Sequence, residues 1–447
     1  MTIGAHRQAI IAVKLAAAAA LAGAAPAAAQ YYPAPMRPVP APWAGPPSIS
    51  LAMPGGGAVA RFYERQQNRL IWLRPGAQGP AANALLTILH SAPVDGLAEG
   101  PQLARQAQQA LRLAATGHPA AVLDADRALS AAWVRYVQAL RRPPQGTIYG
   151  TNAVVPVTAV DVILSDLARA PALLQHLRAT SSVNPIYAQL KADAVEQYRQ
   201  WGVVDPRLQV DLDRSRALPD KGRFVLVNIA SARLFMIEDG RVVDSMRVIV
   251  GKDDKQTPLM ASMIHYATFN PYWNVPDDLI QERIAPNVLS MGTRYLRERG
   301  YEVMLNWSDS SPVLSPDRID WRAVAAGRET IRVRQKPGPA NSMGNLKFSF
   351  PNSEGIYLHD TPNKELFDKD VRALSAGCVR LEDAERLAGW LLRREPWGPA
   401  GVPEAHVPLP DGVPIYLTHL TTRPRSSQSA LVDQVLGGRG SSASGVN

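Results

Sequence analysis

The feature that most constrains the fold is a change in hydrophobic periodicity near residue 222. From about 58 to 216, apolar residues recur at every third or fourth position, as in "PQLARQAQQALRLAA", which is typical of amphipathic helices. After residue 222 the chain shows short apolar or alternating runs bounded by turn residues, from "RFVLVNIA" to about 420. The sequence therefore predicts an α+β multidomain chain, with a mainly helical domain over 58–216 and a mostly β domain over 217–420.

A hairpin and an insertion subdivide the second domain. Asp239-Gly240 separates two alternating runs, and Asp-Gly in that setting is a strong hairpin signal. Residues 278–325, beginning "DLIQERIAPNVLSMGTRYLRERG", then interrupt the strand runs with helical spacing. Insertions between strands often form lids over a site. We therefore expect a helical cap over 278–325.

The two ends of the chain are predicted to lie outside the folded domains. Residues 1–29 begin with the basic segment "MTIGAHRQAIIAVK", continue with a short apolar stretch and end in small residues, as a secretory signal peptide does. No later run of about 18 apolar residues predicts a transmembrane segment. The proline-rich residues 30–57 are typical of an extended linker, and 421–447 of a disordered tail. We expect the mature protein in the periplasm.

Composition narrows the possible partners and cofactors. The net charge of +9 fits either an anionic partner or a solvated basic surface with no partner. The chain has no Lys/Arg block, and export argues against nucleic acid. An anionic envelope polymer fits better. One cysteine and scattered histidines supply no cluster of metal ligands, and no glycine-rich phosphate loop occurs. We therefore expect no metal and no cofactor.

Cys378, the single cysteine, is the candidate nucleophile. Exported proteins usually carry cysteines in pairs, so a lone thiol is either an inert core residue or a reactive group. His359 precedes it after the strand run "GIYL", and a helical pattern begins near Leu381. We expect Cys378 just ahead of a helix N-terminus, where the dipole favours a thiolate. The histidine would take the proton, and the amides of Gly377 and Cys378 would face an oxyanion.

The amino-acid sequence around Cys378 and His359 is a more specific signal than the spacing between the two residues. "IYLHDTP…LFDKDVRALSAGCVRLEDAERLA" resembles the active-site signature of YkuD-type L,D-transpeptidases, a histidine followed by S-x-G-C-[VI]-R. Segments such as "FNPYWNVP" and "RQKPGP" extend the resemblance over about residues 205–420. Residues 58–204 resemble the family more weakly. The chain resembles the large periplasmic branch of that family, which carries a helical scaffold domain.

The resemblance implies roles for particular residues. Cys378 would be the nucleophile and His359 its base, with Gly377 in the catalytic turn. The family orients its histidine through a backbone carbonyl, so Asp360 need not take part. For Trp273, core packing is as good an alternative as a place in the cleft. The residues expected to bind substrate are Tyr357, Ser375, Arg380, Trp273 and Asn270.

The implied reaction is acyl transfer on peptidoglycan stem peptides. The enzyme would attack the bond between the L-centre of a diamino acid at position three and the terminal D-alanine. The side-chain amine of a second stem would resolve the thioester and give a 3–3 cross-link. With water as acceptor the protein would be an L,D-carboxypeptidase, and with a protein amine it would attach an outer-membrane protein to the wall. The alternative from a different class of protein is an inactive wall-binding scaffold, in which Cys378 is left over from a catalytic ancestor and has no catalytic role.

Two departures from the family pattern bear on this interpretation. Ala376 stands where many relatives have histidine or serine before the glycine, which removes a side-chain hydrogen bond but keeps the backbone donor. The chain also runs from Tyr187 to Leu208 without a separate peptidoglycan-binding repeat. Recognition of the wall would then depend on the catalytic domain, its cap and general basicity.

Overall fold

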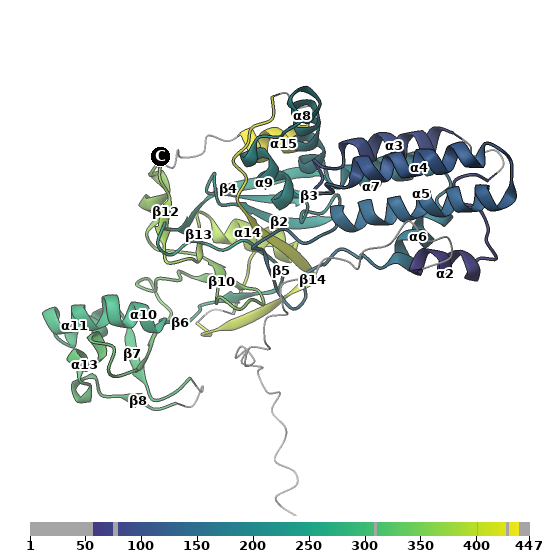
Figure 1. Ribbon diagram of the computed structural model, residues 1–447. Coiled ribbons are helices and arrows are strands. Elements are labelled where there is room, and N and C mark those ends of the chain that lie inside the picture. Colours follow the sequence, from purple (N-terminus) through teal and green to yellow (C-terminus); the bar gives the residue numbers. More distant parts are fainter. Residues whose placement is uncertain (1–56, 75–78, 308–310, 400, 426–428, 438–447) are drawn as a thin grey trace, which may run out of the picture. The chain divides into compact units, whose positions relative to one another are not determined.

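The computed structural model describes most of the chain (Figure 1). Within these residues no helix has both the length and the apolar character needed to cross a bilayer. The expected signal peptide over 1–29 and nearly all of the expected linker lie outside the described residues. The described ranges are 57–74, 79–307, 311–399, 401–425 and 429–437.

The first part of the chain is helical, as its periodicity predicts. Several helices begin with proline in their first turn, where the missing N–H costs no hydrogen bond. Large side chains such as Trp133 and Tyr136 are fully buried in its core. In Figure 1, α3, α4 and α5 run side by side. The helices are α2 (Ala58–Arg65), α3 (Pro80–Ser91), α4 (Gly100–Ala114), α5 (Pro119–Leu140), α6 (Val160–Arg169), α7 (Leu173–Ser182), α8 (Pro185–Trp201) and α9 (Pro206–Ser215).

The second part is built on a sheet that closes on itself. Its strands follow the order β5-β10-β11-β13-β4-β3-β2-β14, and β14 also pairs with β5. A short strand from the helical part, β1 (Ile148–Tyr149), adds to β5 in parallel, which the helical periodicity did not predict. The other strands are β2 (Arg223–Asn228), β3 (Arg233–Glu238), β4 (Arg241–Gly251), β5 (Met260–Phe269), β10 (Leu346–Ser349), β11 (Tyr357–His359), β12 (Ala373–Ser375), β13 (Val379–Leu381) and β14 (Ala405–Thr418).

Alternate side chains along the strands point to opposite faces of this sheet, and each face packs into a different hydrophobic core. The hairpin β3–β4 turns at Asp239 and Gly240, with φ of +46° and +76°, as the Asp-Gly signal predicts. Along β2, Val225 and Val227 join the core that also holds α14 (Ala384–Leu392). Phe224 and Leu226 point the other way and join the core of the helical part. Both faces of the sheet are therefore covered by apolar contacts.

The cap is larger and less helical than its sequence predicts. It contains a four-stranded sheet of order β6-β9-β7-β8, and its apolar core extends from Trp273 to Met343. The prediction of a helical cap over 278–325 is therefore wrong in its bounds and in part of its structure, because the short strands lie directly beside helices and are hidden by them. Its elements are β6 (Trp273–Asn274), α10 (Asp277–Leu279), η1 (Ile280–Ile284), α11 (Ala285–Met291), α12 (Arg294–Glu298), β7 (Tyr301–Met304), β8 (Val313–Leu314), η2 (Pro316–Arg318), α13 (Trp321–Ala325) and β9 (Arg332–Gln335).

The predicted disordered tail over 421–447 is wrong in its middle part. Residues Ala430–Gly437 form α15, and its apolar side chains are buried in the core of the helical part. Ahead of it, the amides of Thr421 and Thr422 donate to Asp211 Oδ2 at 2.8 and 2.6 Å. The spacing of "LVDQVL" is helical, but the glycine- and serine-rich flanks conceal so short a signal. Residues 438–447 lie outside the described part.

Candidate active site

Cys378 lies in a turn between two strands, β12 and β13. The expectation of a helix directly after it is wrong, because Val379–Leu381 pair with both β11 and β4. The alternation of Val379, Arg380 and Leu381 suits a strand with one face in the core. Helix α14 begins only at Ala384, where Asp383 Oδ1 accepts from the amide of Arg386 at 2.9 Å. Cys378 therefore does not stand at a helix N-terminus.

Two hydroxyl groups hold the turn that carries Cys378. Ser375 Oγ donates to the Cys378 carbonyl at 2.6 Å and accepts from the Gly377 amide at 3.2 Å. Thr257 Oγ1 donates to the Gly377 carbonyl at 2.6 Å and accepts from the Gly251 amide at 2.8 Å. Gly377 has φ of +117°, which L side chains rarely adopt, and an added Cβ would meet Ile356 at 3.2 Å. Sequence reasoning missed Thr257, because a threonine in a loop carries no signal of its partners.

This arrangement changes the expected oxyanion site. The Gly377 amide, expected to face the oxyanion, is bound to Ser375 in the resting structure. The amide of Cys378 has no acceptor within the described part of the chain. Cys378 N–H is therefore the donor that the turn leaves open to a ligand.

His359 is held as a neutral base. Its Nδ1 lies 2.5 Å from the backbone oxygen of Asp360. A carbonyl can only accept, so Nδ1 carries the hydrogen and Nε2 keeps its lone pair. Burial lowers the pKa of His359 to about 3, and the nearby charges of Arg380 and Lys347 act in the same direction. The Asp360 carboxylate instead accepts from Lys364 Nζ at 2.6 Å and from the Asn345 amide at 3.0 Å.

Tyr357 joins the two candidate catalytic residues. Its ring lies 5.7 Å from that of His359, in an edge-on arrangement. The Cys378 thiol donates to the carbonyl of Gly355 at 3.8 Å, while Tyr357 lies near the sulfur and Trp273 near the Tyr357 hydroxyl. Burial raises the pKa of the Cys378 thiol, against the opposing effect of Tyr357 and of nearby cations. The resting pair is thus a thiol and a neutral imidazole rather than a thiolate and an imidazolium.

Two cations flank His359 on the neighbouring strands. Lys347 of β10 is the cross-strand partner of His359, and Arg380 of β13 is its partner on the other side. Burial lowers the pKa of both cations. Arg380 is also close enough to Arg283 of the cap for their like charges to lower its pKa further. Sequence reasoning missed Lys347, although it is the one charge in the strand run "LKFSF".

The other predicted substrate-binding residues fall into two groups. Tyr357, Arg380 and Trp273 gather near Cys378, and Trp273 also belongs to the core of the cap, so the two alternatives for it are not exclusive. Asn270 does not lie among these contacts. Its Nδ2 donates to the carbonyls of Val402 at 3.0 Å and Pro399 at 3.4 Å, and thereby fixes the loop ahead of β14.

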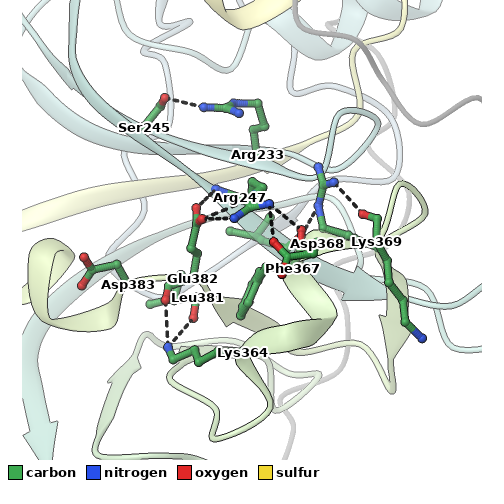
Figure 2. A network of polar contacts seen from close by, with 12 residues as sticks. Arg233, Ser245, Arg247, Lys364, Phe367, Asp368, Lys369, Leu381, Glu382 and Asp383 are labelled. Carbon is green, nitrogen blue, oxygen red and sulfur yellow. Dashed lines mark hydrogen bonds and ion pairs between the residues drawn. The ribbon is translucent and has the colours of Figure 1, made fainter.

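An ion-pair network supports the end of β13 (Figure 2). Arg247 donates through its amide and its Nε to the two carboxylate oxygens of Glu382, both at 2.8 Å. Its guanidinium also reaches Asp368 at 3.1 Å, at the end of the helical turn η3 (Lys364–Asp368). Lys364 Nζ donates to the carbonyl of Glu382 at 2.8 Å. The segment after His359 is therefore tied to the strand after Cys378.

A separate depression of about 710 Å³ contains none of the candidate catalytic residues. Three arginines line it, Arg233, Arg247 and Arg372. Their guanidiniums already donate within the protein, to Ser245 Oγ, to Glu382 and to backbone carbonyls such as that of Lys369. Within the described ranges, no group of three His, Cys, Asp or Glu residues could hold a metal ion.

Fold and site together define a class. A partly exposed thiol directly ahead of a strand that pairs with the strand of a neutral histidine, together with an open amide, resembles the set that acyl transfer by a cysteine requires. Comparison with known families specifies the class further. Residues 222–408 match the L,D-transpeptidase catalytic domain, YkuD, and residues 57–193 match the Scaffold domain. The chain therefore carries a YkuD-type L,D-transpeptidase catalytic domain preceded by a Scaffold domain.

Individual relatives cover only part of the chain. A protein of Haemophilus influenzae, whose name assigns it to the L,D-transpeptidases, is 38% identical over 194 residues. These are 43% of this chain and 38% of that protein, so the chain spans well under half of the relative's length. An L,D-transpeptidase structure from Mycobacterium smegmatis is 12% identical, covers 45% of this chain and 60% of its own, and has a TM-score of 0.22. An L,D-transpeptidase complex with imipenem has the same identity and coverage with a TM-score of 0.21.

Proposed function

We propose that the protein is a peptidoglycan L,D-transpeptidase that forms 3–3 cross-links through a thioester on Cys378. The observation that supports this most directly is the state of His359, which is neutral, fixed by the Asp360 carbonyl and joined to Cys378 through Tyr357. A neutral imidazole with a free Nε2 is ready to accept a proton from the thiol at neutral pH.

Acylation would begin with proton transfer from the Cys378 thiol to His359 Nε2. The sulfur attacks the carbonyl carbon at the L-centre of the diamino acid in the donor stem. The carbonyl oxygen becomes an oxyanion, which the Cys378 amide stabilises. The C–N bond to the terminal D-alanine then breaks, and the imidazolium gives its proton to the departing amine. Cys378 is left as a thioester and His359 is neutral again.

Deacylation would use the same base in the reverse order. The side-chain amine of a second stem attacks the thioester carbonyl and loses a proton to His359. Collapse of the tetrahedral intermediate expels the Cys378 sulfur, which recovers a proton from the imidazolium. The product is an amide between two diamino acids, the 3–3 cross-link. This requires the active protein to meet peptidoglycan in the periplasm, which the predicted signal peptide over 1–29 supports.

The test is mass spectrometry of the mature protein after incubation with a tetrapeptide-containing muropeptide. We expect a cross-linked dimer, loss of D-alanine and an acyl adduct on Cys378. The adduct and the dimer should both disappear in Cys378→Ala. Tripeptide without dimer would contradict cross-linking and indicate hydrolysis or a protein acceptor. A wild-type protein that gives neither product nor adduct would instead be a non-catalytic wall-binding scaffold.

A further inference from the structure

Lys347 is a charged group at the site that the proposed steps leave unused. It lies on β10 between the buried residues Leu346 and Phe348, opposite His359 in the register of β10 and β11. Its Nζ lies 4.6 Å from the centre of the Tyr357 ring. Within the described ranges, no carboxylate lies within ion-pair distance of it. It is therefore a recessed cation without a direct ion pair among the described residues, with Glu404 acting on it only from a longer distance.

Holding the Lys347 ammonium group in a recessed position costs hydration free energy. An ammonium group taken out of water without a carboxylate or a full set of acceptors loses hydration that a ring face only partly replaces. Burial accordingly lowers the pKa of Lys347, while the nearby negative charges of Glu404 and an ionised Cys378 favour its charged form. Glu404 is itself committed to the amide of Tyr272 at 2.6 Å. A ligand anion is the missing partner that would offset this cost.

The register places Lys347 beside the reacting bond. Lys347, His359 and Arg380 are consecutive cross-strand partners, so they form one row on β10, β11 and β13. Neighbouring strands are about 4.8 Å apart, which puts the two cations on opposite sides of the base and about 10 Å apart at their backbones. A carbonyl presented to Cys378 thus has a cation on each side.

The donor of the proposed reaction has carboxylates in matching places. The carboxylate of its terminal D-alanine is three bonds from the scissile carbonyl carbon. A second carboxylate lies at the D-centre of the diamino acid, on the acyl side of the bond. We propose that Lys347 is a specificity-determining residue that binds a carboxylate of the donor stem peptide, and this inference rests on the proposed function.

The test compares Lys347→Met with the wild type on three donor tetrapeptides. One has both carboxylates free, one has the terminal carboxylate amidated, and one has the D-centre carboxylate amidated. For the free donor we expect KM to rise about 10- to 100-fold, the range for loss of a hydrogen bond to a charged group. Amidation of the bound carboxylate should make wild type and variant alike, and the donor for which this happens identifies which carboxylate Lys347 holds.

Two further variants keep the result interpretable. Lys347→Arg retains the charge and should recover most of the wild-type KM, whereas Lys221→Met removes an exposed lysine ahead of β2 and should change nothing. Circular dichroism and thermal unfolding report whether each variant is folded. If Lys347→Met is misfolded by this criterion, Lys347→Gln replaces it as the variant without the charge, and Lys347→Arg remains the control.

The outcomes separate this inference from the proposed function. A wild-type protein that converts no stem peptide defeats the proposed function. Turnover by the wild type, with an equal loss in Lys347→Met for all three donors, overturns only the role of Lys347 in binding. A shift in the pH profile of kcat without any discrimination in KM would show that Lys347 acts on His359 instead, and would also overturn it.

Discussion

At the scale of single residues, protonation of Cys378 decides how reactive the site is at rest. Burial raises the pKa of the thiol, and Cys378 does not stand at a helix N-terminus that would offset this. We therefore predict that the rate of alkylation by iodoacetamide rises continuously with pH through neutrality and levels off only above the ordinary cysteine pKa of about 8.5. Mass spectrometry of the alkylated chain measures this rate. A plateau already reached near pH 6 would contradict a neutral resting thiol.

The lowered pKa of His359 leads to a second prediction, which concerns how the free energy of unfolding depends on pH. His359 has a pKa of about 3 in the folded protein, below the value of about 6.5 expected in an unfolded chain. Between these values the unfolded chain binds the additional proton, so stability falls as pH falls from about 6.5 towards 3. The contribution of one such proton is at most about 1.4 kcal/mol per pH unit.

The measurement is denaturant unfolding as a function of pH for the wild type and His359→Gln. We expect the difference between their unfolding free energies to shrink as the solution becomes more acidic, because glutamine does not titrate. Parallel curves across this window would mean that His359 is protonated in the folded protein.

At the scale of elements, Thr257 supplies from another loop one of the two hydroxyl groups that hold the turn between β12 and β13. Thr257→Val keeps the shape of the side chain but leaves the Gly377 carbonyl and the Gly251 amide without their partner. Each buried unsatisfied group costs about 1–3 kcal/mol, so for these two groups we predict a loss of about 2–6 kcal/mol of unfolding free energy. Turnover should fall as well, because the turn carries Cys378. Chemical denaturation and dimer formation measure the two effects.

Thr361→Val is the matched control for this prediction. Thr361 is also buried and lies close to His359, but its hydroxyl makes one longer contact, with the Asn363 amide at 3.3 Å. A loss no greater in Thr257→Val than in this control would show that the two hydrogen bonds do not hold the turn.

At the scale of the whole molecule, α15 should behave as part of the core. Val432 is fully buried in the cluster that also contains Phe224 and Leu226 of the sheet. Val432→Asp would bury a carboxylate in that cluster, and we predict that it lowers the midpoint of thermal unfolding for helical and β signals together. Circular dichroism measures the two signals. Gln434→Asp places the same charge on the exposed side of α15 and should leave the midpoint nearly unchanged.

The sequence predicted those features that repeat or that have a chemical signature. Helical periodicity before 216 and the Asp-Gly hairpin are local patterns of this kind. The assignment of Cys378 and His359 as a catalytic pair comes from a local motif as well, and stays a prediction. The strand after Cys378 was mistaken for a helix, because three alternating residues directly ahead of α14 continue its apolar spacing. Lys347 and Thr257 escaped notice for a different reason. Their importance comes from cross-strand register and from a loop contact over 120 residues, and neither is visible in a linear pattern.

The closure of the sheet has a consequence for how the chain folds. Strand β14 lies near the end of the described chain, yet it pairs with β2 and with β5, which precede it by more than a hundred residues. Pairings between such distant segments make folding slow, because a long loop must be closed before any contact repays it. The sheet around the cysteine is therefore complete only after the chain has been synthesised beyond β14. Before that point the Cys378 thiol lacks the closed sheet that positions it.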